Sequence, residues 1–117
     1  MRGESNRVTK DVIDRLLYDD SDWCSMQAST FSLATPDGVS LFVYRWLPDQ
    51  PPKAVVQVVH GWAEHAGRYS RLAEALCGAG YAVYADDHRG HGRTAKTPAD
   101  LGYFAETDGW NKCVNDL

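Results

Sequence analysis

Alternating polar and apolar positions predict a β-hairpin near the start of the folded part of the chain. Residues 29–35 alternate, and residues 39–46 resume the pattern with β-branched and aromatic side chains. Between them, Pro36-Asp37-Gly38 supplies residue types suited to a turn with positive φ. The prolines at positions 48, 51 and 52 should end the hairpin, because proline has no N–H to donate to a sheet.

A strand–helix–strand unit is expected next. The run Ala54–Val59 predicts a buried parallel strand, since it is apolar on both faces apart from one glutamine. A helix over residues 67–79 has its apolar stripe at Tyr69, Leu72, Ala73, Leu76 and Cys77. Gly80 should end this helix, and residues 81–85 predict a second buried strand. The fold class is therefore α/β.

The two ends of the chain differ from the middle in composition and in the periodicity of their apolar residues. Residues 1–24 are expected to form an N-terminal extension, either partly disordered or with one short amphipathic helix over residues 8–18. The domain itself is expected over residues 25–117. Within it, residues 97–109 show the low periodicity of a loop, and residues 110–117 begin another helix.

Composition and charge exclude several classes of protein. The 12 Lys and Arg residues against 16 Asp and Glu give a net charge of −4, and no basic cluster could follow a nucleic-acid backbone. We expect no integral membrane contact, since no apolar run approaches the length of about 20 residues that a spanning helix needs. Three cysteines without a Cys-x-x-Cys pair indicate neither a disulfide framework nor a zinc knuckle. Together with an N-terminus that lacks a signal-peptide pattern, this predicts a cytoplasmic protein without a cofactor.

Two polar motifs follow the two predicted parallel strands. His60-Gly61-Trp62-Ala63-Glu64-His65 comes after the first strand, and Asp87-His88-Arg89-Gly90-His91-Gly92 after the second. Ligands of open α/β sheets bind outside the carboxyl ends of the strands, so these motifs should border a site. With their flanking stretches, from Val55 to about Thr94, they resemble the α/β-hydrolase family. The likeness is to its monoacylglycerol lipase and lysophospholipase group, also described as the serine aminopeptidase S33-type domain.

The resemblance covers most of residues 28–117 and implies the N-terminal part of an α/β-hydrolase fold, with an incomplete sheet. It also implies hydrolysis of a small lipid or other carboxylic ester through an acyl-enzyme. By resemblance, the backbone N–H of Trp62 is one of two donors to the oxyanion, its indole lines the acyl pocket, and Gly61 permits the turn. By the same resemblance, His60 belongs to this His-Gly motif and has a supporting role. A loop behind the site is formed by Arg89, Gly90, His91 and Gly92.

The catalytic serine that this family requires is not found among the 117 residues. No serine has glycine at both the second preceding and the second following position, as a Gly-x-Ser-x-Gly elbow demands. The family's neighbouring nucleophile strand would also be missing beside residues 54–59, which would leave an open strand edge. We therefore expect an N-terminal fragment that is inactive alone. The alternative is a non-catalytic interaction module that self-associates through this edge.

Other candidate sites are weaker. His60, His65, His88 and His91 lack the helical spacing and the carboxylate of a metal site, so no metal is expected. Asp86 and Asp87 more simply cap the turn after their strand than form an acid–base pair. Gly78-Ala-Gly80 lies between helix and strand, the reverse of a phosphate-binding loop, which disfavours a nucleotide. Cys77 is expected to be a small buried hydrophobic residue, and Cys24 lacks a neighbouring base.

Overall fold

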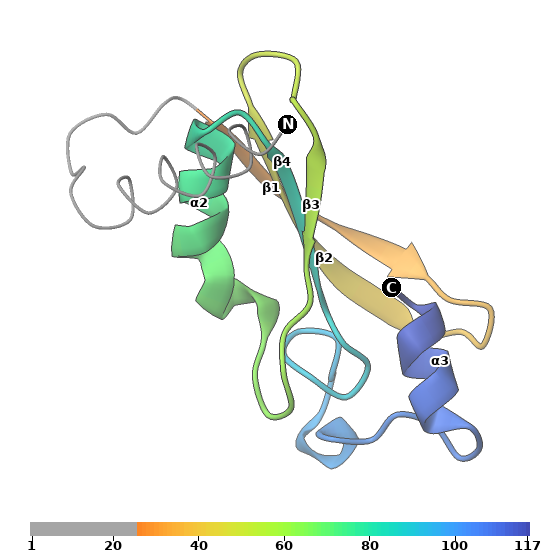
Figure 1. Cartoon of the computed structure of the whole chain (residues 1–117). Helices are drawn as coiled ribbons and strands as arrows, with labels where there is room; N and C mark the ends of the chain where they lie inside the picture. The colour runs from red at the N-terminus through yellow and green to blue at the C-terminus, as the bar shows by residue number, and fades with distance from the viewer. Residues whose placement is uncertain (1–25) are drawn as a thin grey trace.

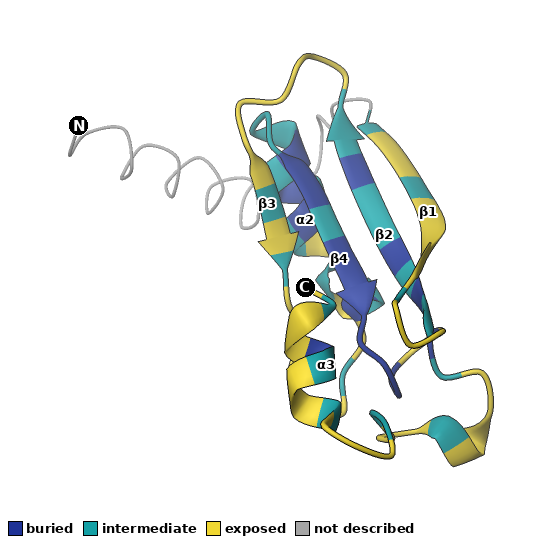
Figure 2. Cartoon of the chain, turned by 90° about the vertical axis from the view of Figure 1, so that its right-hand side faces the viewer, coloured by how far each residue is buried: buried dark blue, intermediate teal, exposed yellow. Residues whose placement is uncertain are grey.

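The structure is a computed structural model that describes residues 26–117. The predicted N-terminal extension, its helix over residues 8–18 and Cys24 lie outside the described residues. Four strands form one mixed sheet, in the order β1-β2-β4-β3 (Figure 2). The strands are β1 (Met26–Ala34), β2 (Ser40–Pro48), β3 (Val55–Val58) and β4 (Ala82–Asp87).

The predicted hairpin is confirmed. Strands β1 and β2 pair antiparallel, with Ala34 opposite Ser40 at the turn. Gly38 has a φ of 87°, the left-handed conformation that the Pro-Asp-Gly sequence indicated. The second strand of the hairpin also pairs antiparallel with β4, so the hairpin is joined directly to the strand–helix–strand unit.

One helix packs on each face of the sheet (Figure 1). The 3₁₀ helix η1 (Ala66–Tyr69) continues into α2 (Ser70–Gly78), and α3 (Gly109–Asn115) lies on the opposite face. Both helices are close to the predicted ranges, and a short 3₁₀ helix η2 (Pro98–Asp100) interrupts the predicted loop. The core between α2 and the sheet contains Trp46, Ala66, Ala73, Cys77, Val83 and Ala85. Cys77 is 2% exposed, which confirms its prediction as a buried hydrophobic residue.

Strand β3 differs from its prediction. Its pairing with β4 is parallel, as expected, but the prediction that it is buried is wrong, since Val55 is 64% exposed. The sheet ends at β3, so within the described residues one long edge of this strand has no partner. The apolar sequence indicated burial, whereas the family resemblance indicated this open edge, which is confirmed. Burial depends on neighbours on both sides of the strand, and the described chain supplies one of them.

Strand β4 is longer than predicted. It continues to Asp87, so Asp86 and Asp87 belong to the strand and not to the turn after it. Because successive side chains in a strand point to opposite faces, the two carboxylates serve different contacts. Asp87 is fully buried, and its two oxygens accept hydrogen bonds from Ala66 N–H at 2.7 Å and Arg93 N–H at 2.8 Å. It therefore caps the loop that follows, as expected, and also holds the start of η1.

Arg89 joins three distant segments. Its side chain is 2% exposed, and its guanidinium contacts the carboxylates of Asp37 in the hairpin turn and Asp116 after α3. Each carboxylate accepts two hydrogen bonds, between 2.7 and 3.0 Å, and the carbonyl oxygen of Phe104 accepts a fifth at 3.1 Å. A guanidinium has five N–H donors, so every one has an acceptor. The contacts raise the pKa of Arg89 and lower that of Asp37.

No helix within residues 26–117 has both the length and the apolar character to cross a membrane.

Removing Asp116 should test the Arg89 contact. We expect Asp116→Ala to lower the free energy of unfolding by about 3 kcal/mol, because a buried cation loses a bidentate partner. Asp116→Asn should cost less, since its amide oxygen still accepts one hydrogen bond. Urea unfolding of the three proteins measures the difference. Equal stability of Asp116→Ala and the unsubstituted protein would contradict the role given to Arg89.

Candidate active site

The turn after β3 holds three consecutive backbone amides in different ways. The N–H of Gly61 donates to Oε2 of Glu64 at 2.7 Å, and the N–H of Ala63 donates to Nε2 of His91 at 3.3 Å. Within residues 26–117, the N–H of Trp62 between them has no hydrogen-bond acceptor. The turn therefore leaves one amide available to a ligand.

The backbone conformation of this turn requires particular residues at particular positions. A Cβ at Gly61 would lie 2.9 Å from the Glu64 carboxylate, so the close approach of the two favours glycine. Ala63 has a φ of 58°, a left-handed conformation that residues with a Cβ seldom adopt. The turn persists because side chains on both sides of Trp62 hold the neighbouring amides.

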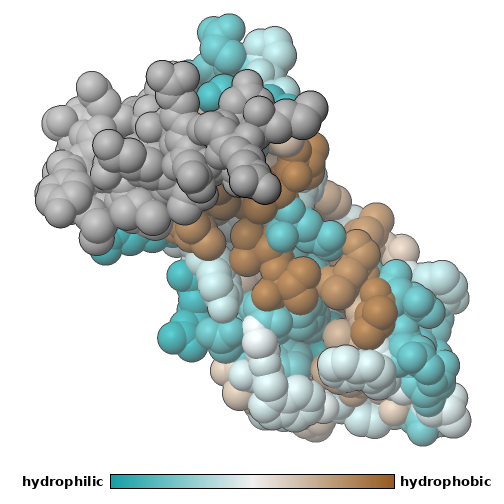
Figure 3. Space-filling view, viewed as in Figure 1, coloured by the Kyte–Doolittle hydropathy of each residue, from teal (hydrophilic) through white to brown (hydrophobic). Residues whose placement is uncertain are grey.

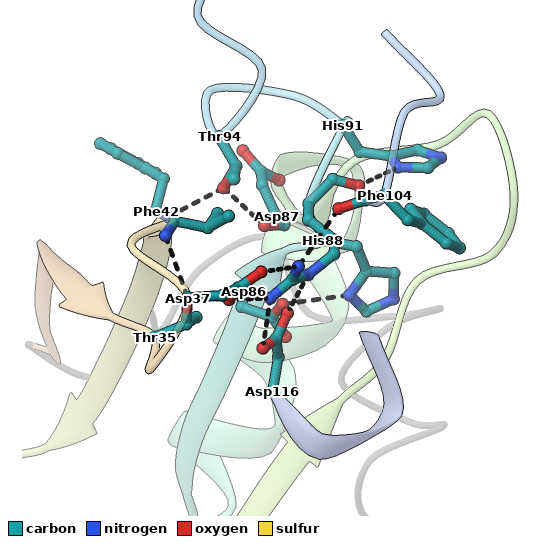
Figure 4. A network of polar contacts seen from close by, with 12 residues as sticks. Thr35, Asp37, Phe42, Asp86, Asp87, His88, His91, Thr94, Phe104 and Asp116 are labelled. Atoms are coloured by element: carbon teal, nitrogen blue, oxygen red, sulfur yellow. Dashed lines mark hydrogen bonds and ion pairs between the residues drawn. The ribbon is translucent and has the colours of Figure 1, made fainter. Parts of the chain in front are cut away.

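The predicted supporting loop lies beside this turn. Gly90 and Gly92 have φ values of 74° and 48°, and a Cβ on Gly92 would collide with the Asp87 carboxylate. These two glycines let the chain fold back so that His91 reaches Ala63. The hydroxyl of Thr94 donates to the Asp87 carbonyl at 2.6 Å and accepts from Phe42 N–H at 2.9 Å, which ties the loop to the hairpin (Figure 4).

Backbone partners define the protonation of two histidines. Nε2 of His60 accepts the N–H of His88 at 3.0 Å, so it carries no proton, and its Nδ1 lies 2.7 Å from the carbonyl of Gly61. Because one nitrogen must donate and the other must accept, His60 is a neutral imidazole with its proton on Nδ1. Similarly, Nε2 of His91 accepts from Ala63, and its Nδ1 lies 3.1 Å from the carbonyl of Arg89. His91 is therefore also neutral.

His88, in contrast, is held in its protonated, positively charged state. Its Nδ1 lies 3.0 Å from Oδ2 of Asp86, and its Nε2 lies 3.0 Å from the carbonyl oxygen of His60. Both partners are acceptors, so both ring nitrogens donate and the ring is an imidazolium. The Asp86 contact accordingly raises the pKa of His88. Its ring stacks on His60 with 3.8 Å between centroids, and burial, followed by the charge of His88, lowers the pKa of His60.

An apolar cavity of about 260 Å³ opens beside the turn. The indole of Trp62 borders it, is 68% exposed, and meets the edges of His91 and Phe104. Helix α3 supplies the far wall through Trp110, Cys113 and Val114. The remaining lining residues are Val59, His60, Gly61, His88, His91, Phe104 and Leu117. An unoccupied amide beside such a cavity suits a ligand that has a polar oxygen and an apolar body.

The structure brings together most of the site residues that the sequence indicated. His60, Gly61, Trp62 and His91 all border the cavity, whereas Arg89, Gly90 and Gly92 support the loop behind it. His65 is exposed and does not line the cavity. Within residues 26–117, no group of three or more His, Cys, Asp or Glu side chains could hold a metal ion.

Four contributors were not foreseen from the sequence. They are Asp37, Glu64, Asp116 and the carbonyl of Phe104, and each acts by holding a group of the site or its supporting loop. For Glu64 the sequence did contain a signal, because a carboxylate three residues after a glycine turn can return to that turn's N–H. The partners of Arg89 carried no such local signal, because Asp37 is 52 residues away and Asp116 is 27 residues away.

Comparison with known proteins agrees with this geometry. Residues 50–117, more than half of the chain, match the family described as serine aminopeptidase, S33. A monoacylglycerol lipase of Mycolicibacterium smegmatis is 49% identical over 85 residues, which cover 70% of this chain and 30% of that protein. A human monoglyceride lipase is 47% identical over 62 residues, 53% of this chain and 20% of that protein. The chain thus spans less than a third of the length of either relative.

A solved structure shows the same arrangement of elements. A thermostable carboxyl esterase from Bacillus coagulans, in complex with glycerol, superposes with a TM-score of 0.65 and 32% identity. The match covers 79% of this chain and 29% of the esterase. The described sheet therefore corresponds to one portion of a larger α/β-hydrolase domain.

The two stacked histidines should titrate in opposite directions. With its pKa raised, His88 contributes stability that is complete below the ordinary histidine pKa, about 6.5, and is lost as pH rises through the raised value. With its pKa lowered, His60 contributes stability above about 6.5 that is lost as pH falls towards the lowered value. In an NMR titration, the Cε1–H of His60 should therefore shift at lower pH than that of His88.

Asp86→Asn should move the His88 titration to lower pH, because the amide no longer stabilises the imidazolium by charge. If the His88 resonance of the unsubstituted protein titrates at lower pH than that of His60, the assigned protonation states are wrong.

Proposed function

Because this chain belongs to the serine aminopeptidase S33 family of α/β-hydrolases, we propose that its described part forms one half of an ester-hydrolysing site. The substrate class is a carboxylic ester with an apolar acyl chain, such as a monoacylglycerol or a lysophospholipid. The observation that carries the proposal is the Trp62 amide, which lacks an acceptor within residues 26–117 while both adjacent amides are held. The apolar cavity beside it is the proposed place of the substrate.

In the proposed reaction, a serine hydroxyl attacks the ester carbonyl carbon and loses its proton to a histidine base. The carbonyl oxygen becomes negatively charged, and the N–H of Trp62 donates a hydrogen bond to it. The carbon–oxygen bond to the alcohol then breaks, and the alcohol leaves with that proton. Water subsequently hydrolyses the acyl-enzyme.

The serine, the histidine base and its acidic partner come in this proposal from polypeptide other than these 117 residues. No serine of the chain stands in a Gly-x-Ser-x-Gly elbow. The second oxyanion donor, which the family takes from the residue after the nucleophile, would come from the same polypeptide. We therefore expect the chain alone to be inactive.

A chimeric enzyme tests the role of Trp62. The matched segment of this chain replaces the corresponding 85 residues of the Mycolicibacterium smegmatis relative, which supplies the remaining polypeptide. We expect the chimera to hydrolyse p-nitrophenyl esters, and Trp62→Pro to lower kcat by about 100-fold or more, because proline removes the N–H donor. Trp62→Ala is the matched control, since it removes the indole but keeps the amide.

Thermal melts must first show that each chimera is folded. A folded chimera without esterase activity would contradict the proposal, as would equal kcat values for Trp62→Pro and Trp62→Ala. Esterase activity of the isolated 117-residue chain, blocked by a fluorophosphonate, would instead contradict the division of the site between two polypeptide segments.

A second candidate function is a non-catalytic module that self-associates through β3. It is favoured by the exposed edge of that strand, where Val55 and Val59 are 64% and 50% exposed. Figure 3 shows hydrophobic residues gathered across the middle of the molecule, over β3 and towards α3. Edge strands with apolar flanks are templates for pairing with a further strand.

Sedimentation of the 117-residue chain tests this alternative. The module predicts a discrete dimer with cooperative melting, and Val55→Lys should shift it to monomer because a charge on an edge strand opposes pairing. Gln50→Lys, which adds the same single charge at an exposed position outside the strand, serves as the control. A polydisperse species, or a dimer unaffected by Val55→Lys, would exclude this mode of association.

A further inference from the structure

The turn that presents the Trp62 amide is held by the side chain of Glu64, a residue of the first motif for which the sequence predicted no role. Glu64 lies two residues after Trp62, and its Oε2 accepts the Gly61 N–H at 2.7 Å. The same oxygen accepts the hydroxyl of Tyr69 at 2.9 Å. One carboxylate oxygen therefore links the residue before Trp62 to the end of η1.

The carboxylate of Glu64 is itself fixed in place. Its second oxygen, Oε1, lies 3.3 Å from the guanidinium of Arg68 in η1. The Gly61 N–H, followed by the Tyr69 hydroxyl, lowers the pKa of Glu64, so the side chain is ionised at neutral pH. Because both oxygens contact groups of η1 or the turn, the position of Gly61 relative to η1 is set by this one side chain.

A peptide plane follows the position of its neighbours. The Trp62 N–H shares its peptide plane with the Gly61 carbonyl, which lies 2.7 Å from Nδ1 of His60. Glu64 holds the plane before it and His91 holds the plane after it, so the Trp62 N–H has little freedom to rotate. Ala63 is also in the left-handed region, with a φ of 58°, from which an unrestrained turn would relax. An oxyanion donor is effective only if its direction is set before the charge develops. The contacts of Glu64 and His91, together with that of His60, supply this condition.

We propose that Glu64 is a positioning residue that aims the Trp62 amide by holding the N–H of Gly61. This inference rests on the proposed function for its catalytic consequence, but the hold itself belongs to the 117-residue chain. Glu64 touches neither the substrate nor the reacting atoms in this proposal. Its effect passes through the backbone of Gly61 and Trp62.

The simpler interpretation is a surface ion pair between Glu64 and Arg68. The Arg68 side chain is 60% exposed, and pairs of that kind contribute little to stability. The two interpretations differ in which oxygen of Glu64 matters. Oε2 carries the contact with Gly61, and Oε1 carries the contact with Arg68.

Three variants separate these contacts. Glu64→Ala removes both. Glu64→Gln keeps an amide oxygen that can accept from Gly61 and Tyr69 in place of Oε2, but loses the charge that pairs with Arg68. Arg68→Ala removes the ion pair alone and leaves the contact with Gly61.

Amide hydrogen exchange of the 117-residue chain, followed residue by residue by NMR, measures the hold directly. In Glu64→Ala we expect the Gly61 amide to exchange at least tenfold faster, and the Trp62 amide resonance to shift or broaden. In Glu64→Gln and Arg68→Ala the Gly61 rate should stay within about threefold of the unsubstituted protein. An unchanged Gly61 rate in Glu64→Ala would overturn the inference, as would equal acceleration in Arg68→Ala.

The same variants in the chimeric esterase test the catalytic consequence. Glu64→Ala should lower kcat by about 10- to 100-fold with KM changed by less than about threefold, because small misplacements of a catalytic group have effects of this size. Glu64→Gln should restore most of the activity. An unchanged kcat in Glu64→Ala overturns the inference. If the chimera has no activity although the exchange results hold, the proposed function fails while the structural hold remains.

Discussion

The architecture depends on a buried guanidinium whose five N–H donors are all satisfied. Burying a cation is costly unless its partners are complete, so Asp37, Asp116 and the Phe104 carbonyl are effectively required by Arg89. These acceptors come from the hairpin turn, from the residue that follows α3, and from the segment before that helix. Their convergence fixes the loop of residues 88–92 against the sheet. The placement of His91 beside the Trp62 turn follows from that loop.

The candidate site uses backbone groups for chemistry and side chains for alignment. Glu64 and His91 take the two outer amides of the turn, and the middle amide remains for an incoming oxygen. The stacked rings of His60 and His88 also fix the turn, since their hydrogen bonds join the residues that follow β3 to those that follow β4. A donor held in this way needs no reorganisation when negative charge appears. The arrangement supports the proposal that the Trp62 N–H stabilises an oxyanion.

The open edge of β3 leaves the described sheet able to pair with a further strand. A strand with one neighbour and exposed valines is suited to receiving another strand. The bacterial and human lipases compared above are each more than three times as long as the segment that they share with this chain. Both proposed functions therefore involve further polypeptide at the same edge, either the remainder of a hydrolase or a second copy of this chain.

The sequence by itself determined the elements and the positions of the motifs. Periodicity predicted the hairpin, the helix that ends shortly before Gly80 and the helix that begins near Trp110, because these depend on local propensity and on which face is apolar. Only the tertiary structure decided that Asp86 makes His88 an imidazolium and that Arg89 binds Asp37 and Asp116. Local pattern carries no information about partners tens of residues away. A charged residue in a loop has the same sequence signature whether it faces water or, like Asp37, binds a guanidinium 52 residues away.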